Sequence, residues 1–303
     1  MSNKTGKVIQ FTLKQVVTSN WFCLITVLGI VCVFLSTQID KILGAIFGTT
    51  VDATGQRNVT LSVEDATSLL QLAIVFVLFL LIMVYGSNIA NSIVEEKSGR
   101  IIETLLCYVK PLELLVGKVT GYLLGIVMQM VVWIGYYVIL DNIMELPENP
   151  VFATLGELPV QVYVLLLVSL IIGFMMYAFA FAALSSYADN AQDSTQLMMP
   201  VAMLMLAAYF VSMSAMYGYG GMWAGIVAKA PFFSPIVSFA TNNLIDMAWS
   251  EVVVNIGIQL VEVVIVALVC ARFYRRGVVS YGIKKVSLKK SEVPGMKDRF
   301  DKM

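Results

Sequence analysis

The chain is 303 residues long, with 59% hydrophobic and 13% charged residues and a mean hydropathy of +0.83. A soluble domain has an apolar share of about 45–50%, so this composition predicts a membrane protein. Its 20 basic and 20 acidic residues cancel to a formal net charge of zero, which excludes a globally basic nucleic-acid-binding protein.

The residue types that carry chemistry exclude most enzymes. The chain has no histidine, so Ser-His-Asp triads, Cys-His pairs and the zinc-protease H-E-x-x-H helix are ruled out. Its 4 cysteines lack C-x-x-C spacing, so we expect neither a disulfide framework nor a metal site. No glycine-rich phosphate-binding loop accompanies Lys7 or Lys118. We therefore expect a chain that is not an enzyme and binds no cofactor of its own.

Six apolar stretches are long enough to cross a bilayer, which takes about 20 residues. An amphipathic basic segment, residues 1–20, comes before them and is typical of an interfacial elbow helix. The spans are predicted at about residues 21–39, 69–93, 119–140, 162–184, 197–217 and 252–271. The expected fold is therefore an all-α polytopic membrane protein, with a single transmembrane domain over residues 1–303.

The distribution of lysine and arginine predicts the orientation of these spans. With the N-terminus inside, the inner segments contain 17 of the 20 basic residues, and 10 of these 17 lie in the basic tail, residues 272–303. The outer segments contain only Lys41, Arg57 and Lys229. The positive-inside rule therefore predicts a multi-pass protein of the cell membrane with both termini cytoplasmic.

A charged segment, residues 95–118, separates the second and third spans. Glu95 begins it, Glu96 stands four residues before Arg100, and Arg100 stands three before Glu103, so one helix flank would carry alternating charge. The opposite flank is apolar at helical spacing, with Ile101, Leu105 and Leu106 as its members. We expect a short amphipathic helix that grips a soluble partner with its charged side. Pro111 ends this piece and starts a second helix that runs through Gly117 and Lys118 into the next span.

Small residues repeat at the head of the third span. Gly117, Gly121 and Gly125 recur every four residues, a small-x-x-x-small pattern that lets helix backbones approach closely in lipid. We interpret this stripe as a helix-packing surface.

Two later segments depart from plain spans. Residues 185–196 form an acidic inner turn with Asp189 and Asp193, which we interpret as a solvated turn. Residues 218–250 are an apolar loop interrupted by Pro231 and Pro235, which predicts a re-entrant hairpin in the outer leaflet. Within it, Ser234 is expected to cap a helix that begins with Pro235.

The last span carries a polar stripe. Asn255, Gln259 and Glu262 lie at i, i+4 and i+7 on an otherwise aliphatic helix, and Gln129 lies on the third span. A charge near the bilayer centre costs roughly 2.5–3.5 kcal/mol, so Glu262 must face protein or a water-filled cavity. A role in a translocation pathway and simple interhelical hydrogen bonding both explain the stripe.

The segment between the spans resembles a known family signature. The pattern E-E-K-x-x-R-I-x-E-x-L-L followed by x-P-x-x-L-L-x-G-K-x-x-G is similar to that of type-2 ABC-transporter permeases, especially the sodium-efflux (Nat-type) branch. The Phe233-Ser234-Pro235 motif and the tail from Ala271 to Lys285 agree with it. The matching residues of the first motif are Glu95, Glu96, Lys97, Arg100, Ile101, Glu103, Leu105, Leu106, Pro111, Leu114, Leu115, Gly117, Lys118 and Gly121.

The resemblance implies a role and partners. In that family the 95–118 segment is a cytoplasmic coupling helix that docks on a separate ATPase subunit, which binds ATP and magnesium. It implies two ATPase copies, and a second permease copy or a homologous permease to complete the pathway. It also implies a bacterial membrane and no nucleic-acid partner.

The substrate is less constrained. The spans offer few oxygen ligands for sodium, whereas 17 methionines suit adaptable apolar surfaces, so we favour an amphipathic or hydrophobic compound, including peptides, over sodium efflux. From other classes, a stand-alone secondary transporter using Glu262 and a non-transporting sensor or immunity protein are the alternatives. A secondary transporter would predict an inverted repeat, which the two halves of the sequence do not show.

Overall fold

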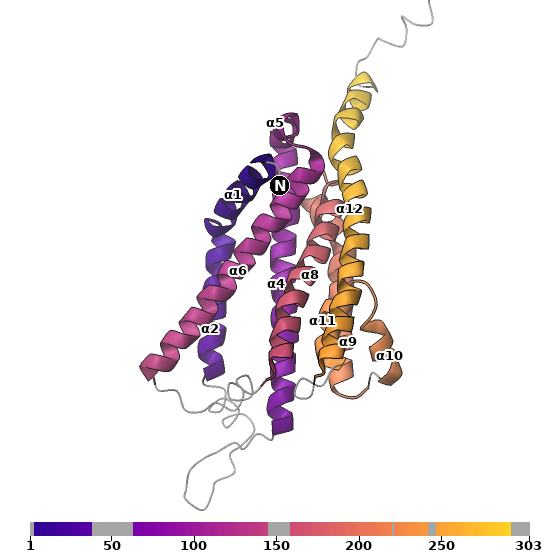
Figure 1. Ribbon diagram of the computed structural model, residues 1–303. Coiled ribbons are helices and arrows are strands. Elements are labelled where there is room, and N and C mark those ends of the chain that lie inside the picture. The colour runs from indigo at the N-terminus through magenta and orange to yellow at the C-terminus, as the bar shows by residue number, and fades with distance from the viewer. Residues whose placement is uncertain (1–2, 38–62, 145–157, 220, 242–246, 292–303) are drawn as a thin grey trace, which may run out of the picture.

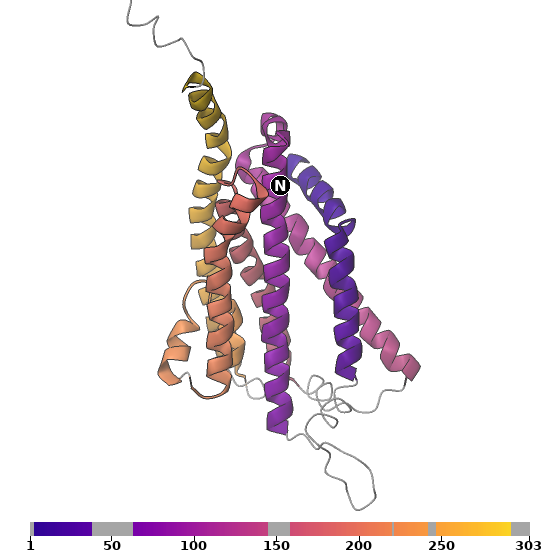
Figure 2. The same ribbon diagram turned by 180° about the vertical axis from the view of Figure 1, so that it is seen from behind.

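The computed structural model describes residues 3–37, 63–144, 158–219, 221–241 and 247–291, and the regular structure of these ranges is entirely α-helical. Figures 1 and 2 show the arrangement from two sides. The helices are α1 (Asn3–Val17), α2 (Asn20–Thr37), α4 (Val63–Ser98), α5 (Ile101–Tyr108), α6 (Pro111–Met144), α8 (Val160–Ser185), α9 (Ala191–Met216), α10 (Gly221–Val227), α11 (Ser234–Thr241) and α12 (Trp249–Ser291).

The helices confirm an all-α polytopic protein. Within the described residues, 5 helices are long and apolar enough to cross a membrane, and a sixth span is obtained if α1 and α2 count as one bent unit. Those two helices meet at 58°. The bend is the one expected of an elbow helix that feeds the first span.

Two helices are much longer than the membrane requires. At 1.5 Å per residue, the 36 residues of α4 extend about 54 Å and the 43 residues of α12 about 65 Å, against a hydrocarbon core of about 30 Å. Helix α12 therefore continues without a break from the predicted span, residues 252–271, through Ser291. Residues 292–303 of the expected basic tail lie outside the described residues.

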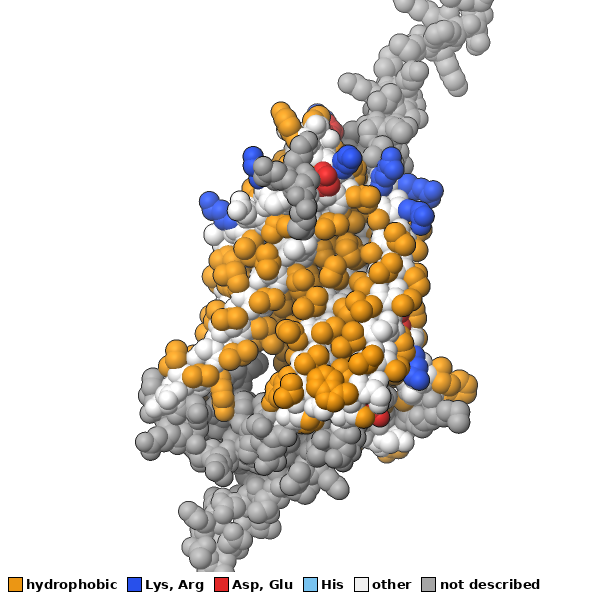
Figure 3. Space-filling view, viewed as in Figure 1, with side chains coloured by type: hydrophobic (Ala, Val, Ile, Leu, Met, Phe, Trp, Pro, Cys, Tyr) orange, Lys and Arg blue, Asp and Glu red, His pale blue; other side chains and the backbone are white. Residues whose placement is uncertain are grey.

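The bundle has two chemically different ends. The start of α1, helix α5 and the last turns of α12 lie together at one end, which we call the α5 end (Figure 1). Helices α10 and α11 lie toward the opposite end, which we call the α10 end. The lysine and arginine side chains gather at the α5 end (Figure 3). This grouping has the form that the positive-inside rule predicts for a cytoplasmic face.

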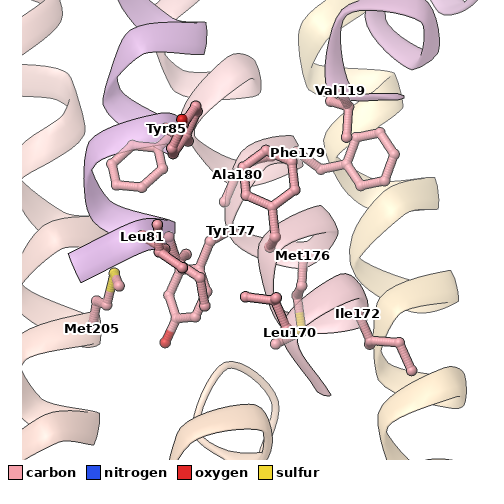
Figure 4. Packing of buried hydrophobic residues seen from close by; sticks show 14 of the residues in the cluster. Leu81, Tyr85, Val119, Leu170, Ile172, Met176, Tyr177, Phe179, Ala180 and Met205 are labelled. Atoms are coloured by element: carbon pink, nitrogen blue, oxygen red, sulfur yellow. The ribbon is translucent and has the colours of Figure 1, made fainter. Parts of the chain in front are cut away.

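Helix α8 forms the centre of the bundle. It packs chiefly against α12 and α4, and two thirds of its most apolar stretch is buried (67%). Figure 4 shows its side chains Met176, Tyr177 and Phe179 meeting Leu81 of α4 and Val119 of α6. Dispersion contacts and close packing hold such an interior together in lipid, where apolar burial between helices gains little.

The glycine stripe of α6 receives the elbow helix. A Cβ atom on any of the three glycines would lie within 2.7 Å of an α1 side chain, closer than real Cβ contacts allow, so only glycine lets α1 approach this far. The pairs repeat with a four-residue period on both helices: Gly117 with Val8, Gly121 with Thr12, and Gly125 with Val16.

The apolar loop before the last span is re-entrant. Helix α11 packs against α9, α4, α8 and α12, and every residue from Ser234 to Ala240 is buried. Pro235 sits against Gly173, where a Cβ would lie 2.7 Å from its ring. The Ser234 hydroxyl donates to Glu262, and α11 begins at Ser234 itself, one residue before the expected start at Pro235.

Candidate functional site

The part of the charged segment before Pro111, expected to be one amphipathic helix, is divided between the end of α4 and α5. Helix α4 ends at Ser98, and Arg100 adopts a left-handed conformation with φ 60° before α5 begins at Ile101. Such a conformation is uncommon for any residue other than glycine. The expected flank of alternating charge from Glu96 through Arg100 to Glu103 is therefore wrong, because the junction turns α5 away from the line of α4.

The second break occurs at Pro111, as its ring predicts. Pro111 is the first residue of α6, where the missing N–H costs nothing. The Glu113 carboxylate accepts a hydrogen bond of 3.2 Å from the backbone N–H of Lys110, one half of a capping box. Helix α5 is thus a separate eight-residue piece between two chain breaks.

Glu96 and Lys118 pair inside the protein. The Lys118 Nζ lies 2.8 Å from the Glu96 carboxylate and donates to the Ser92 hydroxyl at 3.0 Å. Both side chains are buried, with exposed fractions of 10% and 3%. Neither group is on the surface that the sequence assigned to a partner, so we correct their role to one of joining α4 to α6.

Lys97 joins α4 to the α8–α9 turn. Its Nζ donates to the carbonyl oxygens of Ser186 and Ala188 at 2.9 and 2.8 Å and lies 3.4 Å from the Asp189 carboxylate. The turn expected to be merely solvated is therefore anchored. Gly277 of α12 packs on the same turn, since a Cβ there would overlap the Ser186 side chain.

The exposed surface of α5 contains both apolar and charged side chains. Tyr108 and Ile101 are 70% and 53% exposed, and Glu103 and Arg100 are also exposed. Leu105 and Leu106 are half-buried against the core. We call the exposed group Arg100, Ile101, Glu103 and Tyr108 the α5 surface.

A groove runs beside this surface. It has a volume of about 380 Å³ and lies between α1, α5 and α6. Phe11, Leu105 and Tyr108 are among its lining residues, with Lys7 at its edge. Leu105 therefore faces this groove and is not the outermost apolar contact of α5.

Glu262 lies deep in the bundle against the re-entrant helix. One of its carboxylate oxygens accepts a hydrogen bond from the Ser234 hydroxyl, and the other has no partner among the described residues. One turn away, Gln259 accepts from Ser169 at 3.0 Å. The stripe on α12 thus faces α8 and α11, whereas Asn255 at its end is only half-buried.

Gln129 belongs to a different set of contacts. Its Oε1 accepts from Thr26 at 3.1 Å and from Tyr85 at 3.4 Å, so it joins α6 to α2 and α4. None of the hydrogen bonds described for Gln129 involves α11 or α12. The expectation of one polar pathway containing both Gln129 and Glu262 receives no support from these contacts.

The sequence analysis missed two features of α4. Lys97 was part of the family pattern but was given no role of its own. A second polar face is formed by Asn88, Asn91 and Glu95 at spacings of three and four residues; Asn88 and Asn91 were treated as part of an apolar span, and Glu95 as part of the coupling segment. The polar run from Ser87 to Ser92 was the available signal. No group of three or more acidic or cysteine side chains that could hold a metal occurs in the described ranges.

The bundle, its elbow and its re-entrant hairpin define a polytopic α-helical membrane protein. Residues 40–272 match the family model of the ABC-2 family transporter proteins. This match covers well over half of the chain, and the chain belongs to that family.

Two curated relatives are similar to it. One is "Uncharacterized protein YhaP" of Bacillus subtilis (strain 168), 28% identical over 214 residues, which are 68% of this chain and 50% of the relative. The other is "Uncharacterized protein MJ1024" of Methanocaldococcus jannaschii, 25% identical over 215 residues, which are 71% of this chain and 51% of the relative. The chain spans about half the length of these relatives.

Proposed function

We propose that the chain is the membrane permease subunit of an ATP-driven exporter and that a separate ATPase subunit docks on the α5 surface. Membership of the ABC-2 family supports the permease role. The observation that carries the docking site is α5 itself, a short helix set off by two chain breaks at the basic end of the bundle. Its first and last residues, Ile101 and Tyr108, are exposed to solvent.

The surroundings of α5 support a coupling role. The last turn of α4 is tied to α6 by Glu96 and to the α8–α9 turn by Lys97. Force applied to α5 would therefore reach three membrane helices through short, buried contacts. Helix α5 follows directly on this anchored turn of α4, so a movement of a partner bound to α5 would be transmitted into the bundle.

Association with an ATPase tests the docking site. We expect the full chain, purified from its own membranes, to co-elute with a protein that has phosphate-binding-loop motifs and hydrolyses ATP. Tyr108→Asp should remove most of this protein and its activity, because a charge replaces the most exposed apolar contact of α5. Tyr219→Asp is the matched control, since Tyr219 is 86% exposed at the α10 end.

Equal ATPase recovery with both variants would show that docking occurs elsewhere. Absence of any ATPase from the wild-type preparation would favour the secondary-transporter or sensor alternatives.

Cysteine labelling tests the proposed orientation. In a cysteine-free background, Tyr219→Cys should react in intact cells with an impermeant thiol reagent, and Glu103→Cys should react only after the cells are opened. Labelling of position 103 from outside would reverse the assignment of the α5 end to the cytoplasm.

An amphipathic or hydrophobic compound, including a peptide, is the substrate class we propose, and sodium is the alternative. A sodium site would draw several oxygen atoms together. Around Glu262 the Gln259 oxygen already accepts from Ser169, and the Glu262 oxygen nearest α11 accepts from Ser234. The separation of these contacts from those of Gln129 favours the amphiphile. The variant Glu262→Gln separates the two substrate classes, because a sodium pathway should lose its activity and an amphiphile pathway should keep it.

A further inference from the structure

A second polar site lies at the α5 end, between α1, α2, α4 and α6. It is a cavity of about 200 Å³ beside the 58° bend that joins α1 to α2. Its polar lining includes Gln15 of α1 and Asn88, Asn91 and Glu95 of α4. None of them has a role in the packing contacts or in the proposed docking surface.

These side chains have few partners in the protein, although the Glu95 charge acts on the Lys118 ammonium. Within the described part of the chain, the side chains of Gln15, Asn88, Asn91 and Glu95 form no hydrogen bond or ion pair. Their neighbour Ser92, in contrast, accepts from Lys118. Gln15, Asn91 and Glu95 are exposed and Asn88 is half-buried, so all four are accessible to a ligand in the cavity. A few convergent polar groups in a cavity are the usual mark of a ligand site.

The charge of the cavity selects the ligand. Glu95 is the only charged residue among those described as lining it. Lys118 lies behind Ser92, but its charge is balanced by Glu96 at 2.8 Å. Aromatic rings complete the wall, Trp21 and Tyr122 among them, and their faces attract cations. The site therefore favours a positively charged group over an anion.

The shape of the cavity selects an amphiphile. Asn88, Asn91 and Glu95 share one face of α4 and rise about 10 Å along it at 1.5 Å per residue. Trp21, in the first turn of α2, is 56% exposed toward the surroundings of the bundle. An aromatic side chain at this level of a membrane protein is typical of the lipid–water boundary. A charged head group fits beside Glu95, with an apolar chain leaving past Trp21.

We propose that this cavity binds the ammonium head of an amphiphile that enters from the leaflet at the α5 end. Glu95 is its counter-ion, and the carbonyl oxygens of Gln15, Asn88 and Asn91 accept hydrogen bonds from its N–H groups. As a statement of what the exporter carries, this rests on the proposed function. The same head-group chemistry occurs in amine lipids and in free alkylamines.

Equilibrium binding tests the site without an ATPase. The full chain is placed in nanodiscs of a neutral galactolipid, which contain no amine, and titrated with tritiated dodecylammonium. We expect saturable binding to one site. Glu95→Gln should weaken it about tenfold or more, because a hydrogen bond to a charged group contributes about 1.5–3 kcal/mol. Asn91→Leu should also weaken it. Glu103→Gln is the matched control and should bind as the wild type does.

Addition of phosphatidylethanolamine to the discs distinguishes the two sources. Competition with dodecylammonium assigns the site to an amine lipid, and absence of competition assigns it to a free amphiphile. Wild-type binding by Glu95→Gln, or equally tight binding of tritiated dodecyl sulfate, would overturn the proposal. Tyr108→Asp should bind dodecylammonium normally, so loss of ATPase association and loss of this site are separate results.

Discussion

The two ends of the bundle bury acidic groups in opposite ways. At the α5 end, Glu96 is neutralised by the Lys118 ammonium at 2.8 Å. Toward the α10 end, Glu262 meets only the hydroxyl of Ser234, and its second oxygen has no partner among the described residues. The two halves of helix α6 also differ in packing. The first half packs against α1 through three glycines, whereas most side chains of the second half are exposed. The α5 end is therefore held by a buried ion pair as well as by close packing, and the buried acid toward the α10 end has a hydroxyl as its partner.

Removal of the Glu96 charge should expose this difference most strongly. Glu96→Ala leaves a buried ammonium without its partner, which typically lowers the free energy of unfolding by about 3–5 kcal/mol. Replacement of both Glu96 and Lys118 by methionine should restore most of this loss, because a well-packed apolar pair needs no neutralisation. Equilibrium unfolding in mixed detergent measures both.

The matched control is Glu103→Ala, an exposed acid on α5, whose effect should stay within about 0.5 kcal/mol. If Glu96→Ala costs no more than this control, the α5 end is not held by its ion pair.

Substitutions in α6 sharpen the comparison along a single helix. Gly121→Leu should lower the free energy of unfolding by about 1–3 kcal/mol, because a Cβ there would lie 2.7 Å from the Thr12 side chain. Gly135→Leu, where nothing lies within 4 Å, should be neutral or stabilising by up to about 1 kcal/mol, since glycine disfavours helix. Similar losses at both positions would contradict the asymmetry.

The smallest effect is expected at Glu262. In Glu262→Gln the amide oxygen still accepts from Ser234, so we expect unchanged folding and continued export of amphiphiles. Resistance of cells to amphiphilic compounds and peptides, with and without the variant, measures this. Sodium-dependent growth protection that disappears in Glu262→Gln, with no change in resistance to those compounds, would show that a cation is the substrate.

The sequence predicted the spans and the breaks better than the contacts. Over the described residues, apolar length placed five of the six spans within the observed helices, and the span predicted at 197–217 ends one residue past α9. Pro111 marked the start of α6 because its ring fits only the first turn. The left-handed Arg100 was not predictable, since nothing in residue type favours it there. The conformation of Arg100 alone separates Glu96 from Glu103, so the predicted helix flank of alternating charge does not form.

The partners of individual charges could not be predicted either. Glu95, Glu96 and Lys97 are consecutive, yet they face a cavity, α6 and the α8–α9 turn. Helical geometry makes consecutive side chains point to different sides of the helix, but only the tertiary structure determines which neighbour lies on each side. For the same reason the glycine stripe indicated close packing without indicating that the elbow helix was its partner.

The matched four-residue repeat of α1 and α6 limits how the two helices can move. Each of three α1 side chains packs against a glycine of α6: Val8, Thr12 and Val16. A slide of less than one turn would move these side chains onto larger α6 residues beside the glycines, where they would clash. The next equivalent position lies four residues away, about 6 Å along the axis. The two helices therefore have discrete packing registers: α1 either moves together with the first half of α6 or shifts along it by about one helical turn. Because α1 leads directly into α2, each such shift would also change the position of the first membrane span relative to α6.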